Sequence, residues 1–212
     1  MKNYLRLGLL ALAAALVLAS CGNSGEGSQG NADSQQKETD GMPGMDHGSG
    51  GMASGMLMEN GKYSDKAFID AMVPHHQGAI EMAQVALKNA EHEEIKELSR
   101  NIVSTQQAEI EELKSIKQEE FGTSNVPMEM SQEQLRSMGM MDPQQLANRE
   151  PFDKAFVDAM IPHHQSAIEM AEVAYQKSEN PRIKELAGNI VSDQQAEIEQ
   201  MKQWREQWYP QD

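Results

Sequence analysis

The sequence of 212 residues has a single cysteine, Cys21, and an excess of acidic over basic residues. A single cysteine excludes an internal disulfide framework and a thiolate metal cage. Against 33 aspartates and glutamates there are 18 lysines and arginines, which gives a formal net charge of −15. Such a surface repels nucleic acid and anionic lipid headgroups, and it attracts cations without choosing among them. We therefore expect metal ions as partners and no nucleic acid.

The motifs of common enzyme classes are missing as well. We find no Ser-His-Asp or Cys-His arrangement and no phosphate-binding loop, so a hydrolase or a transferase has little support. The one long apolar run, Leu7–Ala19, is too short for a comfortable membrane span. We expect that the protein is not an enzyme.

The apolar run follows the basic residues Lys2 and Arg6 and ends in "LASC", an order typical of a secretory signal peptide. The letters "LASC" resemble the lipobox of bacterial lipoproteins. That resemblance implies removal of residues 1–20 as a lipoprotein signal peptide and lipidation of Cys21, which would attach the protein to a membrane. We expect a cell-envelope protein, in the periplasm or outer membrane or on the outer cell surface. An uncleaved N-terminal anchor is the alternative.

Residues 21–61 are rich in Gly, Ser and Met and poor in other large apolar side chains. Such a segment cannot bury enough surface to offset its ordering entropy, so we expect a disordered tether. Thioethers a few residues apart in a flexible chain can wrap a Cu(I) or Ag(I) ion. The candidate ligands in the tether are Met42, Met45, His47, Met52, Met56 and Met58. A low-complexity spacer without metal is the alternative.

The rest of the chain is a duplication with an offset of 88 residues. Residues 65–85 match residues 153–173 at 17 of 21 positions, and residues 95–111 match residues 183–199 at 14 of 17. Each half has the apolar periodicity of two helices. Because only a few residues link the two helices, each half must form an antiparallel hairpin.

Neither hairpin can bury its apolar stripe alone, so we expect the two to pack as an all-α four-helix bundle. Ser64 is a good N-cap and predicts the start of the first helix. Asn180 followed by Pro181 predicts the start of the last helix. The expected hairpins are residues 62–120 and 151–212, with a connector at residues 121–150.

Each repeat places two histidines beside a proline within an amphipathic helix, in "AMVPHHQGAIEMA" and again in "AMIPHHQSAIEMA". At about 100° per residue, His75 and His76 flank an apolar stripe that contains Met72. Pro74 removes a backbone hydrogen bond, so we expect a kink there that turns both imidazoles inward. The same pattern holds in the second repeat.

Two carboxylates, Glu109 and Glu197, fall inside the apolar stripe of the second helix of each hairpin. A buried carboxylate is costly unless it is paired or bound to a metal. Counting the register about the turn places Gln106 opposite His75 and Glu109 opposite Met72. The candidate metal ligands are Met72, His75, His76, Met82, Glu109, Met160, His163, His164, Met170 and Glu197.

Two interpretations of these residues compete. In one, the histidines are buried polar residues hydrogen-bonded to glutamate or glutamine, and the methionines fill the core. In the other, they bind a metal. The same grouping in both halves favours metal binding. Imidazole with thioether suits Cu(I), and Cu(II) through imidazole, whereas Zn(II) would prefer more histidine or carboxylate.

The stretches "FIDAMVPHHQGAIEMA" and "FVDAMIPHHQSAIEMA" resemble the signature of a bacterial secreted family known as domain of unknown function 305. The resemblance covers about residues 62–209. It implies a ferritin-like four-helix bundle and, because some members are linked to copper, a role in copper binding and tolerance. By motif match it implies ligands at Met72, His75, His76, Met82, Met160, His163, His164 and Met170.

We expect a lipid-anchored copper-binding protein that buffers or stores copper or confers tolerance to it. A ferritin-like di-metal oxidase is one alternative, but it needs Glu-x-x-His pairs in the core, and Glu81 and Glu169 point outward. The inward carboxylates are Glu109, Glu197 and, as a further candidate, Asp193. A metal-free structural or partner-binding bundle is the other alternative, with an aromatic patch at residues 204–209.

Overall fold

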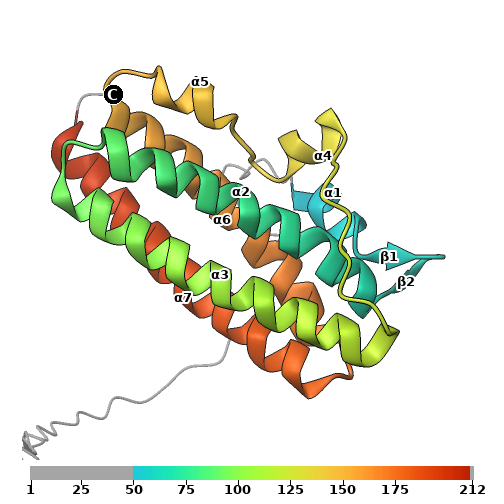
Figure 1. The fold of residues 1–212 in the computed structure, drawn as a ribbon. Coiled ribbons are helices and arrows are strands. Elements are labelled where there is room, and N and C mark those ends of the chain that lie inside the picture. The colour runs from blue at the N-terminus through green and yellow to red at the C-terminus, as the bar shows by residue number, and fades with distance from the viewer. Residues whose placement is uncertain (1–49, 211–212) are drawn as a thin grey trace, which may run out of the picture. The chain divides into compact units, whose positions relative to one another are not determined.

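The computed structural model describes residues 50–210 (Figure 1). The expected signal peptide, the lipidation site Cys21 and the first part of the tether lie outside the described residues. Within residues 50–210, no helix is both long enough and apolar enough to cross a membrane.

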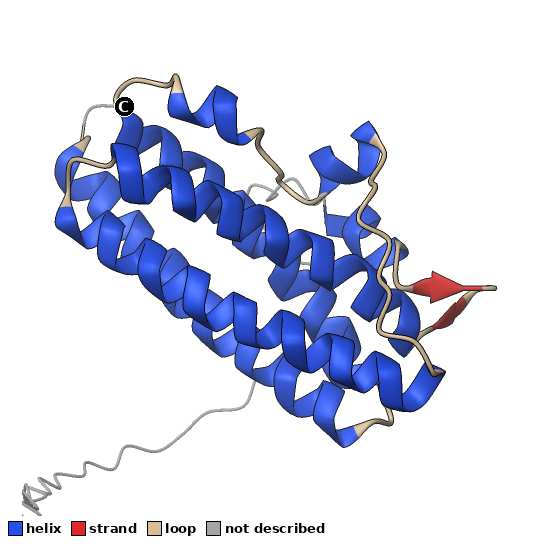
Figure 2. Ribbon diagram, in the orientation of Figure 1, coloured by secondary structure: helices blue, strands red, loops and turns tan. Residues whose placement is uncertain are grey.

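Within the described part of the chain, four long helices pack side by side as a bundle, and the prediction of an all-α helical bundle is confirmed (Figures 1 and 2). They are α2 (Asp65–Asn89), α3 (Glu93–Phe121), α6 (Phe152–Lys177) and α7 (Pro181–Trp208). Helices α2 and α3 form one hairpin and α6 and α7 form the other, while α2 also packs on α6 and α3 on α7.

The predicted helix starts are confirmed, because they depend on local hydrogen bonds. The Ser64 side chain accepts a hydrogen bond from the amide of Ala67 at 3.2 Å and caps α2. The Asn180 side chain accepts one from the amide of Arg182 at 2.9 Å, with Pro181 in the first turn of α7. At the end of α3, Gly122 adopts the left-handed conformation with φ of 72° that favours glycine.

The apolar core of the bundle is divided into two clusters by a polar layer. The first apolar cluster contains Met72 of α2 and Met170 of α6. The other contains Met82 of α2 and Met160 of α6. The two His-His pairs lie between these positions on both helices, so buried imidazoles occupy the middle of the bundle.

The last part of the expected tether differs from the prediction. Residues 50–61 contain the short helix α1 (Gly50–Gly55) and the strand β1 (Met58–Glu59), which pairs with β2 (Lys62–Tyr63) in an antiparallel hairpin (Figure 2). Ala53 and Leu57 are fully buried in the core. Because Leu57 has apolar surface to bury, this stretch packs on the bundle, and α1 lies against α6.

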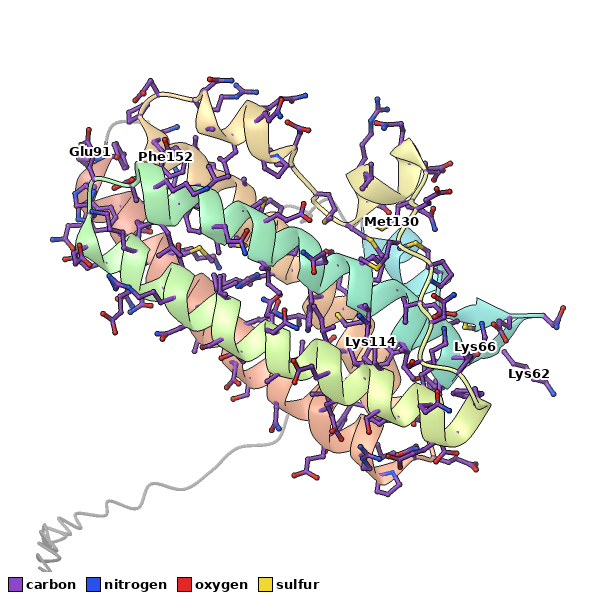
Figure 3. The ribbon with its side chains drawn as sticks, viewed as in Figure 1. Lys62, Lys66, Glu91, Lys114, Met130 and Phe152 are labelled. Carbon is purple, nitrogen blue, oxygen red and sulfur yellow. The ribbon has the colours of Figure 1, made fainter. Side chains whose placement is uncertain are left out.

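The connector between the hairpins also packs on the bundle. It contains α4 (Gln132–Ser137) and α5 (Pro143–Ala147). Helix α5 contacts α2 and α6, and Leu146 on it is fully buried. Figure 3 labels Met130 in the segment before α4, where its side chain packs against the first apolar cluster. The connector therefore covers the α2 and α6 side of the bundle.

Candidate metal centre

The predicted histidines come together in the middle of the bundle. All four are fully buried. The rings of His75 and His163, one from each repeat, have their centroids 3.8 Å apart with an interplanar angle of 41°. Within each pair the ring centroids are 6.1 Å apart, between His75 and His76 and between His163 and His164. The structure thus joins the two copies of the motif in one cluster.

Ser166 fixes the tautomer of His75. Its hydroxyl lies 2.8 Å from Nε2 of His75, and 2.8 and 2.9 Å from the carbonyl oxygens of His163 and Met138. Carbonyl oxygens only accept, so the hydroxyl proton must point to one of them. The Nε2–H of His75 then donates to Ser166, and the lone pair of His75 is on Nδ1.

The outer histidine of each pair contacts a glutamate of the neighbouring helix. Nε2 of His76 lies 2.9 Å from a carboxylate oxygen of Glu109, and Nε2 of His164 lies 2.6 Å from one of Glu197. The predicted register, with Glu109 opposite Met72, is wrong by about one helical turn. A carboxylate that accepts from the far nitrogen of an imidazole is the usual outer partner of a histidine ligand.

The remaining nitrogens of the cluster have no hydrogen-bond partner. This holds for Nδ1 of all four histidines and for Nε2 of His163. Nε2 of His76 also lacks a partner at hydrogen-bonding geometry, although it lies 2.9 Å from a carboxylate oxygen of Glu109. Burial lowers the pKa of His75 and His163 well below the ordinary value, and the neighbouring imidazoles lower it further. His75 and His163 are therefore neutral, and neutral imidazole is the form that binds metals.

The four methionines of the motif lie in the core on both sides of the histidine layer. Each is at most 1% exposed. They are Met72, Met82, Met160 and Met170. Helices α2 and α6 remain helical through Pro74 and Pro162. Whether the prolines kink these helices, and whether the thioethers bind a metal, stay predictions.

As the side chains lie, the described residues contain no group of three or more His, Cys, Asp or Glu side chains arranged to hold a metal ion. A metal in the layer would therefore use few imidazoles together with thioether, or would require side-chain rotation. Low coordination numbers with soft ligands suit Cu(I) better than Zn(II).

Asp193 of α7, which the sequence suggested as a further inward carboxylate, lies close enough to Glu109 and Glu197 to feel the charge of both. Burial raises the pKa of Asp193, and the charges of Glu109 and Glu197 raise it further. Asp193 and Glu109 also line a groove of about 500 Å³ between α3 and α7. This side of the histidine layer therefore faces a negatively charged groove.

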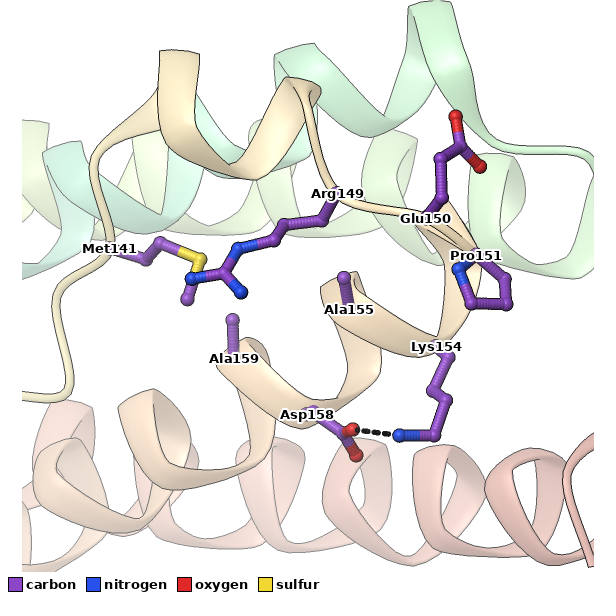
Figure 4. A pocket seen from close by; sticks show the side chains of 8 residues that line it. All are labelled: Met141, Arg149, Glu150, Pro151, Lys154, Ala155, Asp158 and Ala159. Carbon is purple, nitrogen blue, oxygen red and sulfur yellow. Dashed lines mark hydrogen bonds and ion pairs between the residues drawn. The ribbon is translucent and has the colours of Figure 1, made fainter. Parts of the chain in front are cut away.

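A further pocket lies outside the histidine layer. It has a volume of about 580 Å³, and none of the predicted metal ligands lines it. Figure 4 shows Lys154 and Asp158 on its wall, paired at 3.1 Å, and Met141 and Arg149 opposite them. It contains no histidine and only one methionine, so this pocket does not share the chemistry of the histidine layer.

The tether ligands divide into two groups. Met42, Met45 and His47 lie outside the described residues, and so does the side chain of Met52. Met56 packs partly buried against the first apolar cluster, whereas Met58 is 47% exposed. Metal binding by the tether stays a prediction.

Several solved structures are similar to this chain. CopM in the Cu(II)-bound form is 44% identical, with a TM-score of 0.65 over 70% of this chain and 99% of CopM. CopM in the Cu(I)-bound form is 42% identical, with a TM-score of 0.63 over the same shares. A DUF305 fragment from Deinococcus radiodurans is 25% identical, with a TM-score of 0.59 over 65% of this chain and 92% of the fragment.

One curated protein is similar over a shorter stretch. The uncharacterized protein L153 of Acanthamoeba polyphaga mimivirus is 45% identical over 49 residues, which are 23% of this chain and 32% of that protein. The chain thus matches about a third of the length of this relative. Residues 16–117 and 65–205 match the family described as Domain of unknown function (DUF305). Together these two regions span most of the chain, and the protein belongs to the DUF305 family.

Proposed function

We propose that this protein binds copper in the buried histidine layer and serves to buffer or store copper or to confer tolerance to it. The proposal rests on the Nδ1 atoms of the four buried histidines, none of which has a hydrogen-bond partner. An unsatisfied buried polar group costs about 1–3 kcal/mol. Four such groups are a large cost against a total stability of about 5–15 kcal/mol. A bound metal would satisfy those Nδ1 atoms that ligate it.

Copper is the metal that these ligands favour. The layer offers neutral imidazoles and buried thioethers, which together form a soft to intermediate ligand set suited to Cu(I). Cu(II) could be held through the imidazoles. CopM, whose solved structures include Cu(I)-, Cu(II)- and silver-bound forms, is similar over nearly its whole length. This similarity supports the same class of cargo here.

The positions of the two glutamates favour an orienting role over direct ligation. Each carboxylate lies against Nε2 of a histidine, so it can hold the ring with Nδ1 directed to the metal. This arrangement also weakens the di-metal oxidase alternative. That class of site uses several carboxylates as direct ligands. Glu81 is exposed on the outside of the bundle, whereas Glu169, which was expected to point outward as well, is half-buried.

The role we propose is carriage of a metal, without catalysis. The layer is enclosed by the two apolar clusters, and no catalytic motif accompanies it. We further propose an extracytoplasmic location with a lipid on Cys21. The support is the order of segments at the N-terminus, where basic residues are followed by an apolar run and then by "LASC". Thioethers do not form disulfides, so they can still bind copper in an oxidising compartment where free thiols would be oxidised.

The test is metal binding by the full chain, kept in mild detergent because of its apolar N-terminal run. Cu(I), Cu(II), Zn(II) and Fe(II) are titrated, and bound metal is measured after desalting. The parent is compared with a variant in which His75, His76, His163 and His164 are replaced by glutamine. The matched control is His92→Gln, which changes a histidine outside the layer. Circular dichroism shows whether each variant keeps its helices.

We expect the parent and the control to retain copper and the four-histidine variant to lose most of it. Copper retained equally by all three would move the activity to the methionines of the tether and make the histidines structural. No metal retained by the parent would leave a metal-free bundle. If the fourfold variant loses its helices, the single variants His76→Gln and His164→Gln decide the question in folded protein.

A further inference from the structure

The two repeats differ at one position in the histidine layer. His75 donates to the hydroxyl of Ser166, 2.8 Å away on the other repeat. The repeat offset makes Gly78 the counterpart of Ser166 and His163 the counterpart of His75. Nε2 of His163 faces Gly78, 3.7 Å from the point where a Cβ would stand, and no hydroxyl is present there. This nitrogen is fully buried and has no partner at hydrogen-bonding geometry, although the nearby backbone carbonyl of His75 opposes the lowering of the pKa of this ring.

The space above Gly78 is filled by a thioether of the connector. A Cβ on Gly78 would lie 2.6 Å from Sδ of Met140 and would overlap its methyl carbon. Only glycine allows so close an approach. The sulfur of Met140 and Nε2 of His163 therefore both lie close to the Cα of Gly78.

The backbone of the connector is held in place at this point. Gly139 has a φ of 64°, and a Cβ there would lie 2.8 Å from the backbone nitrogen of His163. The Met138 carbonyl lies 2.9 Å from the hydroxyl of Ser166, and the Met138 side chain is 1% exposed. Two close backbone contacts and a buried anchor thus fix the position of Met140 against α6.

The same thioether lies on the wall of a solvent-facing pocket. The pocket has a volume of about 470 Å³, and Gly78 and Met140 line it. Its charged lining residues are two acids, Glu81 and Asp142, and one base, Arg136, so its charge is negative on balance. Met140 is partly exposed, whereas His163 behind it is fully buried. Met140 therefore stands between the solvent and the unpartnered nitrogen of His163, and the acidic residues would attract a cation to the opening.

From this arrangement we infer that Met140 and His163 bind one soft monovalent cation, Cu(I) or Ag(I), at a site that exists in only one of the two repeats. The ligands are the thioether Sδ of Met140 and Nε2 of His163, a donor pair that selects soft ions. The counterpart nitrogen of His75 already donates to Ser166, so the other repeat has no equivalent site. This inference rests on the proposed copper-binding function and adds to it an entry point through the connector.

The test follows Ag(I) binding by NMR of the full chain in detergent, with the methionine methyl groups labelled with ¹³C. The methyl signal of Met140 is assigned by its loss in Met140→Leu, a change that keeps the apolar volume. We expect this signal to shift with the first equivalents of Ag(I). Met140→Leu should bind one Ag(I) fewer or bind it at least about tenfold more weakly. The control Met128→Leu changes an exposed connector methionine outside this pocket and should match the parent.

A second variant tests whether the site requires the missing side chain at Gly78. Gly78→Ser introduces the residue of the other repeat, and its Cβ should displace the thioether and abolish the shift of the Met140 signal. A Met140 signal that stays in place while Ag(I) perturbs the histidine rings would overturn this inference and leave the proposed function standing. Ag(I) that perturbs the tether methionines alone, or no signal, would overturn both. Equal losses in Met140→Leu and Met128→Leu would also overturn the assignment to Met140.

Discussion

The imidazoles of His75 and His163 face each other at a centroid distance of 3.8 Å, although 88 residues separate them in the sequence. Both rings are fully buried, and burial lowers the pKa of both. Two protonated rings could not occupy this position, because like charges would repel in a medium of low dielectric constant. The arrangement therefore requires neutral histidines and makes the metal-free protein sensitive to acid.

We expect the metal-free protein to lose stability as the pH falls below about 6.5. Below that value the unfolded chain binds protons at His75 and His163 that the folded chain does not bind, so the free energy of unfolding decreases. The contribution is present in full above pH 6.5, and each histidine adds a slope of up to about 1.4 kcal/mol per pH unit. Urea unfolding with a chelator at pH 7.5, 6.0 and 5.0 measures it.

The control for this effect is the double variant His75→Gln/His163→Gln. Glutamine does not titrate, so the variant should show a smaller decrease in stability between pH 7.5 and 5.0 than the parent. An identical pH dependence in the two proteins would contradict neutral, proton-excluding histidines at the centre of the layer.

Glu109 is expected to strengthen copper binding without being a ligand. Its carboxylate lies 2.9 Å from Nε2 of His76 and orients that ring. Removal of such an outer partner costs about 10–100-fold in metal affinity. We predict a loss of that size for Glu109→Gln in competition with a chromogenic Cu(I) chelator. The exposed neighbour Glu111→Gln is the control and should bind as the parent does. A complete loss of bound metal would instead indicate direct ligation by Glu109.

Two corresponding ion pairs differ in burial, and they should differ in energy. Lys117 pairs with Asp70 and is 2% exposed, and it also donates to the backbone oxygen of Asn125. Its counterpart in the second repeat, Arg205, pairs with Asp158 at 2.7 Å and is 25% exposed. Removing one partner of a buried pair leaves an uncompensated charge and costs about 3–5 kcal/mol, whereas exposed pairs contribute about 0–1 kcal/mol.

We therefore predict that Lys117→Ala lowers the free energy of unfolding by about 3 kcal/mol and Arg205→Ala by less than about 1 kcal/mol. Chemical denaturation of both variants at pH 7 measures the difference. Similar losses in the two variants would show that the burial of Lys117 does not set the energy of its pair.

Asp153 of α6 caps the start of α3 across the bundle. Its carboxylate accepts hydrogen bonds from the amides of Glu91 and His92 at 3.0 and 2.8 Å, and from Nδ1 of His92 at 2.6 Å. The N-cap residue of α3 has no side-chain cap of its own. We predict that Asp153→Ala costs about 1–3 kcal/mol, because three donors lose a charged acceptor.

Hydrogen exchange provides a local measurement of this effect. The amides of Glu91 and His92 should exchange faster in Asp153→Ala than in the parent. The control is Asp142→Ala, which removes the side-chain cap of the short helix α5. It should leave the exchange of residues 91 and 92 unchanged. Unchanged exchange in Asp153→Ala would rule out a capping role for this carboxylate.

The elements that depend on neighbours in the sequence could be predicted without the structure. Ser64 and the pair Asn180–Pro181 mark helix starts because a cap is a hydrogen bond within three residues. The apolar period and the repeat together define two hairpins, which can bury their stripes only against each other. The same period places His75 and His163 at the edge of the apolar stripe, and both are fully buried. These features are confirmed because each is determined by local geometry.

The contacts across the bundle were decided by tertiary packing. The axial offset of α3 against α2 brings Glu109 to His76 and not to Met72, and this offset depends on how side chains interdigitate along both helices. The docking of Met140 above Gly78 depends on a long connector that has no regular period. The sequence contained one signal of it, the difference between Gly78 and Ser166 at equivalent positions. The duplicated sequence thus determined which histidines and methionines enter the core. Packing decided which of them face each other and which nitrogens lack a hydrogen-bond partner, because the two repeats are packed differently.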